Sequence, residues 1–138
     1  MKILAVDYGK KYIGLAVSDE MELVATTLPY FQTKTEQDKL KKITALIKTI
    51  NPRLIVLGLP QRGQIYDEVQ KFGKQIKESS NTDILYWNED YTSKQAEQGR
   101  SIKFKKGKSH SESARIILQE YLDSELHQDL ISKKIRKP

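Results

Sequence analysis

Cysteine is absent from the 138-residue sequence, and its absence excludes disulfides and thiolate metal centres. The sequence has only two histidines, His110 and His127, which cannot form a zinc site by themselves. No apolar run approaches the roughly 20 residues that a membrane-spanning helix needs, and the residues after Lys2 do not resemble a signal peptide. These absences predict a cytoplasmic protein with no membrane partner.

Positive charge, by contrast, is in excess. The formal net charge is +6 and the isoelectric point is about 9.4. Basic residues cluster between positions 103 and 108 and again in the last six residues. Such clusters are typical of surfaces that bind phosphate backbones, but lysine runs also occur as solvated loops and tails. Charge alone therefore leaves a nucleic-acid partner and a merely solvated surface as open alternatives.

The hydrophobic pattern predicts one domain over residues 1–138, with a basic tail over about 128–138. We expect strands at 2–7, 11–18, 22–28, 53–58 and 83–87, with Pro29 ending the third strand. Helices are expected after Thr35, over about 66–78, from Thr92 to about 104, and across the apolar face that contains Ala114 and Leu118. A lysine-rich loop at 105–108 separates the last two helices. This order predicts an α/β fold, a mixed sheet flanked by helices.

Asp7 follows an unbroken apolar run and precedes Tyr8 and Gly9. A charge in that place is costly unless it meets a metal ion, a cation or water. In open α/β sheets ligands bind at the strand ends, so the position favours a functional carboxylate that lies outside the packed core. Because Asp and Gly are also common turn residues, a plain turn is the alternative.

Glu89 lies just beyond the strand that ends at Trp87. If that strand and the first were parallel neighbours, Asp7 and Glu89 would converge at one edge of the sheet. Paired carboxylates beside basic segments suit a phosphodiesterase that uses Mg²⁺ or Mn²⁺, because these ions favour carboxylate oxygens and keep positions open for water and phosphate. The alternative for Glu89 is an exposed loop residue beside Asp90.

The sequence resembles the YqgF/RuvX family, whose members are described as Holliday-junction resolvases and as nucleases that mature the 5′ end of pre-16S rRNA. The matching segments span nearly the whole chain and comprise Asp7-Tyr8-Gly9, residues 13–19, residues 56–60, Glu89, Thr92, Ser93, Ala96 and residues 116–122. The resemblance implies a ribonuclease H-like fold with a five-stranded mixed sheet, in which the first three strands are antiparallel and the others parallel. It also implies a metal-dependent endonuclease acting on structured nucleic acid.

The family's site residues transfer only in part. Asp7 matches the acid of the first strand, and Glu89 matches the Glu of an Asp-Glu-Arg signature whose flanks are Asn88 and Asp90 here. The position of the last acid holds His110 instead. His110 has three interpretations. It is a metal ligand, a general acid or base, or a solvated residue at the start of a helix in a protein that has lost its catalytic activity.

For binding nucleic acid the candidates are the basic residues near the predicted site: Arg62, Lys103, Lys105, Lys106 and Lys108. The expected partner is structured RNA, precursor rRNA or branched DNA, bound by a monomer or a weak homodimer. Two other functions compete with the nuclease. One is an inactive RNA-binding module with the same fold, and the other is a phosphotransferase, which normally needs two such domains. The chain has no Walker A sequence.

Overall fold

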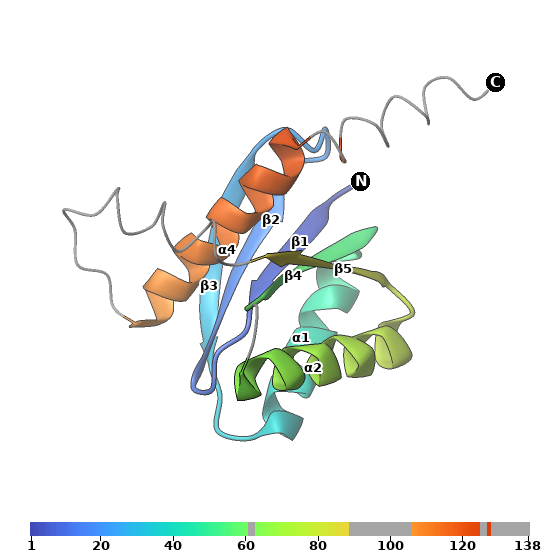
Figure 1. Ribbon diagram of the computed structural model, residues 1–138. Helices are drawn as coiled ribbons and strands as arrows, with labels where there is room; N and C mark the ends of the chain where they lie inside the picture. The colour runs from blue at the N-terminus through green and yellow to red at the C-terminus, as the bar shows by residue number, and fades with distance from the viewer. Residues whose placement is uncertain (61–62, 89–105, 125–126, 128–138) are drawn as a thin grey trace.

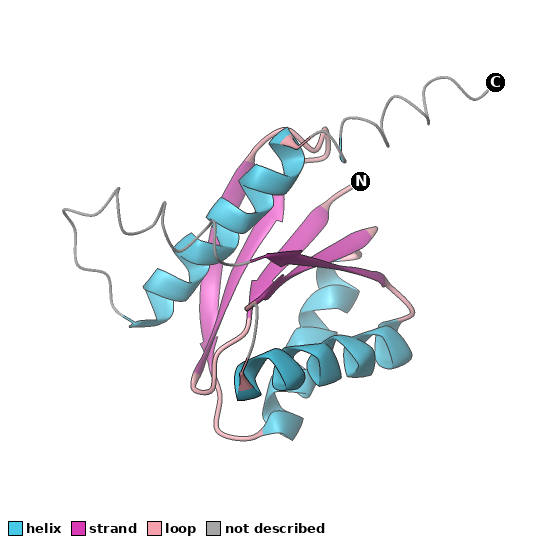
Figure 2. Cartoon of the chain, viewed as in Figure 1, coloured by secondary structure: helices cyan, strands magenta, loops and turns pink. Residues whose placement is uncertain are grey.

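A computed structural model describes residues 1–60, 63–88, 106–124 and 127. Figure 2 shows the strands lying together in the middle of the molecule, with helices on either side of them. In order, the elements are β1 (Ile3–Asp7), β2 (Tyr12–Ser18), β3 (Ala25–Gln32), α1 (Glu36–Ile50), β4 (Leu54–Leu59), α2 (Gln64–Ser80), β5 (Asp83–Asn88) and α4 (Lys106–Asp123). None of the helices in these described ranges is long and apolar enough to cross a membrane.

The five strands form one mixed sheet in the order β3-β2-β1-β4-β5. β1 pairs with β2 and β2 with β3 in antiparallel fashion, whereas β1, β4 and β5 run parallel. α4 covers one face of the sheet, and α1 and α2 cover the other (Figure 1). The architecture expected from the sequence is confirmed, and it aligns the carboxyl ends of β1, β4 and β5 at one edge.

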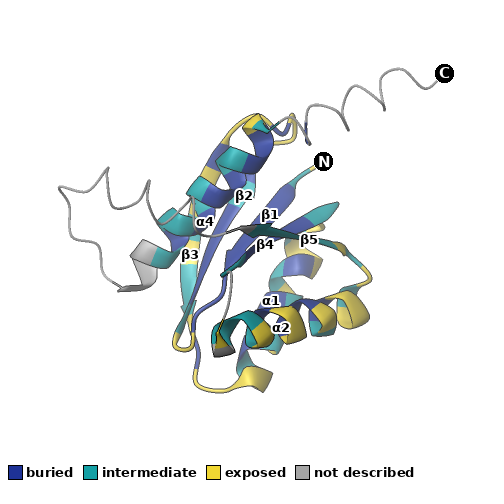
Figure 3. Ribbon diagram, in the orientation of Figure 1, coloured by how far each residue is buried: buried dark blue, intermediate teal, exposed yellow. Residues whose placement is uncertain are grey.

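Two hydrophobic cores hold these layers together, and β1 contributes to both because its side chains alternate between the faces. Leu4 and Val6 pack with the residues of α1 and α2, whereas Ile3 and Ala5 pack with α4. Every residue of β1 is buried, as the dark blue strand in Figure 3 shows. The alternation places the last residue of β1, Asp7, on the α4 side.

The third strand is longer than the sequence predicts. β3 continues through Pro29 to Gln32, so the expectation that Pro29 ends the strand is wrong. Ile13 pairs with Phe31 and Leu15 with Leu28, which leaves one extra residue on β3 between these pairs. Proline is tolerated there because β3 is an edge strand and the position lies in a bulge, where no ladder bond is lost.

The helix ends follow from local chemistry. Thr35 caps α1 by accepting a hydrogen bond from the backbone N–H of Asp38 at 3.0 Å, and Asn51 ends the helix in the left-handed conformation. The start after Thr35 matches the prediction. The prediction fails at the start of α4, because Lys106 and Lys108 belong to the helix and not to a loop. The helix expected between Thr92 and residue 104 lies outside the described residues.

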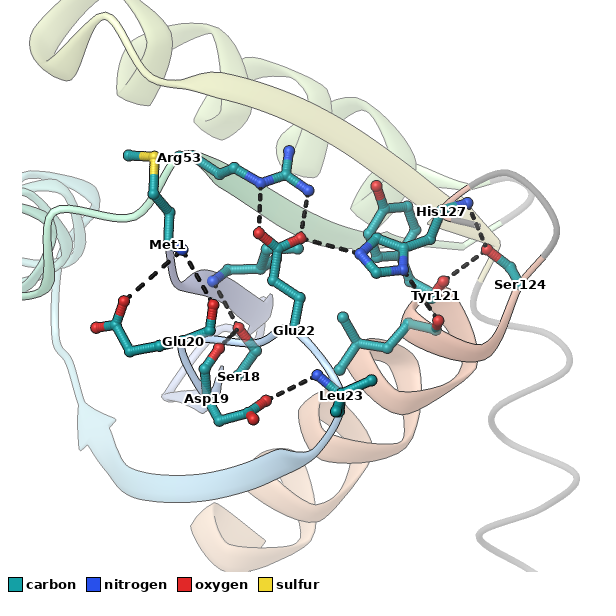
Figure 4. A network of polar contacts seen from close by, with 12 residues as sticks. Met1, Ser18, Asp19, Glu20, Glu22, Leu23, Arg53, Tyr121, Ser124 and His127 are labelled. Atoms are coloured by element: carbon teal, nitrogen blue, oxygen red, sulfur yellow. Dashed lines mark hydrogen bonds and ion pairs between the residues drawn. The ribbon is translucent and has the colours of Figure 1, made fainter. Parts of the chain in front are cut away.

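At the edge of the sheet opposite Asp7, a polar cluster joins three distant segments (Figure 4). The carboxylate of Glu22 accepts two hydrogen bonds from the Arg53 guanidinium, one of them from Nε at 2.8 Å, and a third from His127 Nε2 at 2.9 Å. Nδ1 of His127 is 3.0 Å from the carbonyl oxygen of Leu122. The cluster links the β2–β3 connection, the start of β4 and the chain beyond α4.

Candidate active site

Asp7, the last residue of β1, is only 4% exposed. This corrects the expectation that it lies outside the packed core. Its side chain shares the parity of Ile3 and Ala5, which pack against α4. A carboxylate in such a buried place needs a polar or cationic partner, because an isolated charge would lose its hydration without compensation.

His110 is a partner of Asp7, although 103 positions separate the two in the chain. Its Nδ1 lies 2.8 Å from Oδ2 of Asp7. Because a carboxylate oxygen can only accept, the bond requires a proton on Nδ1 and makes Nε2 the basic nitrogen of the neutral ring. The His110 side chain is 34% exposed and that of Asp7 is 6% exposed, so the pair extends from the core to the surface.

Gly14 brings α4, and with it His110, directly onto the sheet. A Cβ atom at Gly14 would lie 2.0 Å from the backbone carbonyl carbon of His110. The next helical residue, Ser111, accepts a hydrogen bond from the N–H of Leu15 at 3.2 Å and donates one to the carbonyl oxygen of Leu28 at 3.0 Å. The backbone of α4 therefore rests on β2 and is bonded to both β2 and β3.

Gly9 permits a second close approach beside the pair. A Cβ atom at Gly9 would lie 2.4 Å from the carbonyl oxygen of Tyr12 and 3.0 Å from Cε1 of His110. The ring of Tyr12 is tilted by only 24° from that of His110, with the two centroids 6.5 Å apart. A larger residue at position 9 would push the imidazole away from Asp7.

Tyr8 fixes the same segment from the opposite face of the sheet. Its hydroxyl donates to Oε1 of Glu36 at 2.7 Å and accepts from the buried Nζ of Lys39 at 3.2 Å. Its ring packs against Phe72 with 5.1 Å between centroids. Burial first, and then the hydrogen bond and negative charge of Glu36, raise the pKa of Tyr8, so the phenol keeps its proton. Asp7 is thus held by contacts on both sides.

Other predicted site residues are only partly placed. Glu89, Arg62, Lys103 and Lys105 lie outside the described residues, and Lys106 and Lys108 lie in the first turn of α4. β4 lies between β1 and β5, so the assumption that these two strands are neighbours is wrong. Across the described residues no group of three or more His, Cys, Asp or Glu side chains could hold a metal ion.

The comparisons with known proteins agree with the resemblance noted in the sequence. A family model described as "RuvX: Holliday junction resolvase" matches residues 1–124. The chain belongs to the RuvX family. A relative from Dictyoglomus turgidum named "Putative pre-16S rRNA nuclease" is 37% identical, over 90% of this chain and 95% of its own. A relative from Paraburkholderia phymatum with the same name is 35% identical, over 88% of this chain and 84% of its own.

Two solved structures are similar in fold to this member of the RuvX family. Thermus thermophilus RuvC in complex with a Holliday junction substrate has a TM-score of 0.57 and 14% identity, over 88% of this chain and 93% of its own. The fowlpox virus Holliday junction resolvase has a TM-score of 0.58 and 14% identity, over 89% and 98%. The ribonuclease H-like fold implied by the resemblance is therefore confirmed.

Sequence reasoning missed three residues that shape the site of this RuvX protein: Gly14, Ser111 and Tyr12. Gly14 could have been found, because a glycine inside a strand often marks the close approach of another backbone. Tyr12 could have been assigned to the α4 side from its parity with Gly14. Ser111 carried no such signal, since its two bonds span 96 and 83 positions of the chain.

Proposed function

We propose that this protein is a divalent-metal-dependent endonuclease that hydrolyses phosphodiester bonds of structured nucleic acid at Asp7 and His110. The observation that carries the proposal is the 2.8 Å contact between these two side chains at the carboxyl edge of the sheet, in a member of the RuvX family. The names of the relatives favour precursor 16S rRNA as the substrate, and the resemblance noted in the sequence implies its 5′ end.

The chemistry of the two side chains fits a divalent ion. Adjacent ligands of an octahedral ion with bonds of about 2.1 Å are about 3 Å apart, close to the separation of His110 Nδ1 and Asp7 Oδ2, so an ion could replace the proton that these two atoms share. The same contact also fits an arrangement in which Asp7 orients the imidazole and Nε2 binds the ion. In either arrangement Asp7 provides the negative charge and His110 a neutral nitrogen, a mixed set that Mn²⁺ accepts better than Mg²⁺.

Two ligands are too few, and we propose Glu89 as the third. Leu85 and Trp87 of β5 pack with the α4 core, on the same face as Asp7. Position 89 follows β5 directly in the sequence, since the strand ends at Asn88, and it lies outside the described residues. Because β1 and β5 are parallel, their carboxyl ends share one edge of the sheet even though β4 intervenes. When bound there, a divalent ion would activate water and stabilise the charge on the phosphate.

The protein's own residues would then position the substrate. We propose that Arg62, Lys103, Lys105, Lys106 and Lys108 contact the phosphate backbone, in keeping with the net charge of +6. Burial of Asp7 keeps water away from one side of the carboxylate, and the bond to His110 orients the imidazole. The contacts of Tyr8 and Gly9 keep both groups in place while substrate binds.

The name of the family model favours a second candidate substrate, a four-way DNA junction. The test is therefore a cleavage assay with two labelled substrates, a precursor 16S rRNA fragment and a four-way DNA junction, each with Mg²⁺ or Mn²⁺. We expect the wild-type protein to cleave the RNA and Asp7→Asn to lose cleavage by about a hundredfold or more. Preferred cleavage of the junction would assign the second substrate.

The matched control is Asp67→Asn, an exposed residue on α2 at the opposite face of the sheet. It should cleave at the wild-type rate. Thermal unfolding of Asp7→Asn should remain cooperative, because Asn keeps the shape of Asp. Cleavage by folded Asp7→Asn at the wild-type rate would refute the site, and no cleavage of either substrate by the wild type would favour the inactive binding module.

A further inference from the structure

Tyr12 lies beside His110 on the α4 side of the sheet, and Tyr30 lies beside Tyr12. Tyr12 begins β2, and its ring is nearly parallel to the imidazole, at 24° and 6.5 Å between centroids. Tyr30 of β3 meets the ring of Tyr12 edge to face, at 74° and 5.6 Å. The two phenol rings therefore continue the proposed active site outward along the end of the β2–β3 hairpin, whose strands lie side by side in Figure 1.

The backbone explains why both rings reach this face. Tyr12 shares the parity of Gly14 and Ala16, which lie against α4. Tyr30 is one of the two residues between the Leu28 and Phe31 pairs, where β3 carries its extra residue. A β-bulge changes the direction in which a side chain points. At this bulge Tyr30 contacts Tyr12 and does not pack in the core on the other face of the sheet.

Neither tyrosine is needed to fill a core. Both are half-buried, and neither belongs to the two hydrophobic clusters of the described residues. By contrast Tyr8 and Tyr121, which are buried, do belong to them. Partly exposed aromatic rings beside a site for phosphodiester chemistry offer faces on which nucleobases stack.

We propose that Tyr12 and Tyr30 form a stacking platform for unpaired nucleobases next to the bond that the Asp7 and His110 site would hydrolyse. This inference rests on the proposed function and specifies its substrate as a single-stranded or unpaired segment. Bases inside a continuous duplex have both faces covered by their neighbours and cannot reach such a platform. The positive charge of the protein attracts single-stranded and duplex nucleic acid alike, so it is base stacking that distinguishes the single strand from the duplex.

Binding can test the platform without any cleavage. Fluorescence anisotropy in EDTA would compare a labelled single-stranded RNA of about 12 nucleotides with the same sequence as a duplex. Tyr12→Leu and Tyr30→Leu remove the aromatic face but keep apolar bulk, and Tyr12→Phe keeps the face. Tyr66→Leu is the matched control, because Tyr66 is a half-buried tyrosine of α2 on the opposite layer.

We expect each leucine variant at position 12 or 30 to weaken single-strand binding by about 5- to 100-fold, with little change for the duplex. Tyr12→Phe and Tyr66→Leu should bind like the wild type. Equal losses for both probes, or no loss for the single strand, would overturn the platform. Thermal unfolding identifies a leucine variant that fails to fold. In that case the test is repeated by comparing Tyr12→Phe with Tyr12→His, because the smaller imidazole ring is a poorer stacking face.

The platform and the nuclease can fail separately. Selective loss of single-strand binding, with no cleavage by the wild type, would support the platform and refute the nuclease. Cleavage that depends on Asp7, with unchanged binding by the leucine variants, would refute the platform alone.

Discussion

At the residue scale, His110 occupies the position at which the resemblance noted in the sequence implies an acid. Its contact with Asp7 shows that His110 is not an isolated surface residue, since Nδ1 meets a carboxylate that is 6% exposed. This argues against the interpretation of His110 as a merely solvated residue. Its role as a metal ligand or as a group that moves a proton depends on which of its ring nitrogens binds the ion and which carries the proton.

His110→Asp should increase the rate with Mg²⁺ relative to the rate with Mn²⁺, because a second carboxylate suits the harder ion better than imidazole does. We expect the ratio of the two rates to change by about tenfold. His110→Ala should lower both rates without such a change in preference. Initial rates at saturating metal measure these ratios, and identical ratios for the two variants would show that His110 does not bind the metal.

At the scale of elements, the site depends on how closely α4 approaches β2. The approach is possible because Gly14 has no side chain, and Ser111 bonds to β2 and β3. Gly73 makes a similar approach elsewhere, where a Cβ atom would lie 2.2 Å from the hydroxyl of Tyr86. A side chain at Gly14 would have to displace the backbone of α4, whereas one at Gly73 would have to displace only the end of the Tyr86 side chain.

Gly14→Ala should therefore destabilise the protein by about 3 kcal/mol, at the upper end of overpacking costs, and should displace His110. Gly73→Ala should stay within about 1 kcal/mol of the wild type, because Tyr86 can swing aside and alanine favours the helix. Urea unfolding gives both free energies. Equal costs for the two substitutions would mean that α4 can lift from β2 without loss.

Much of this arrangement was predictable from the sequence. Apolar runs and capping residues located the hairpin, α1 and the central strands, because these signals act over a few neighbouring residues. The continuation of β3 through Pro29 was not predictable, since it depends on β3 being an edge strand. The resemblance places Asp7 and His110 in one site, but their direct hydrogen bond is not predictable from the sequence, because it forms only after α4 packs on the sheet.

At the scale of the whole molecule, the cluster of Glu22, Arg53 and His127 joins segments at the edge opposite the proposed site (Figure 4). Burial by itself would raise the pKa of Glu22, but the hydrogen bonds from Arg53 and His127 outweigh burial and lower it to about 2. The carboxylate form is therefore coupled to folding. β1 and α4 run from this edge to the proposed site.

The pKa of Glu22 is about 4.5 in the unfolded chain and about 2 in the folded one. Its contribution to the free energy of unfolding is therefore complete above pH 4.5 and is lost as the pH falls towards 2. That contribution is on the order of 3 kcal/mol. Urea unfolding between pH 2.5 and 7 should show that the free energy of unfolding of the wild type falls at acidic pH, and that it falls less in Glu22→Gln. Glu112→Gln, which alters the half-exposed pair with Arg115, is the control. Parallel pH curves for wild type and Glu22→Gln would exclude the coupling.

If Asp7 and His110 hold a divalent ion as proposed, substitution of Asp7 must weaken Mn²⁺ binding. Electron paramagnetic resonance of free Mn²⁺ gives the dissociation constant for wild type, Asp7→Asn and Asp67→Asn without any substrate. We predict that the wild type and Asp67→Asn bind one ion with equal affinity and that Asp7→Asn binds it about tenfold more weakly or worse. Equal affinity of folded Asp7→Asn and wild type would mean that Asp7 does not bind the ion.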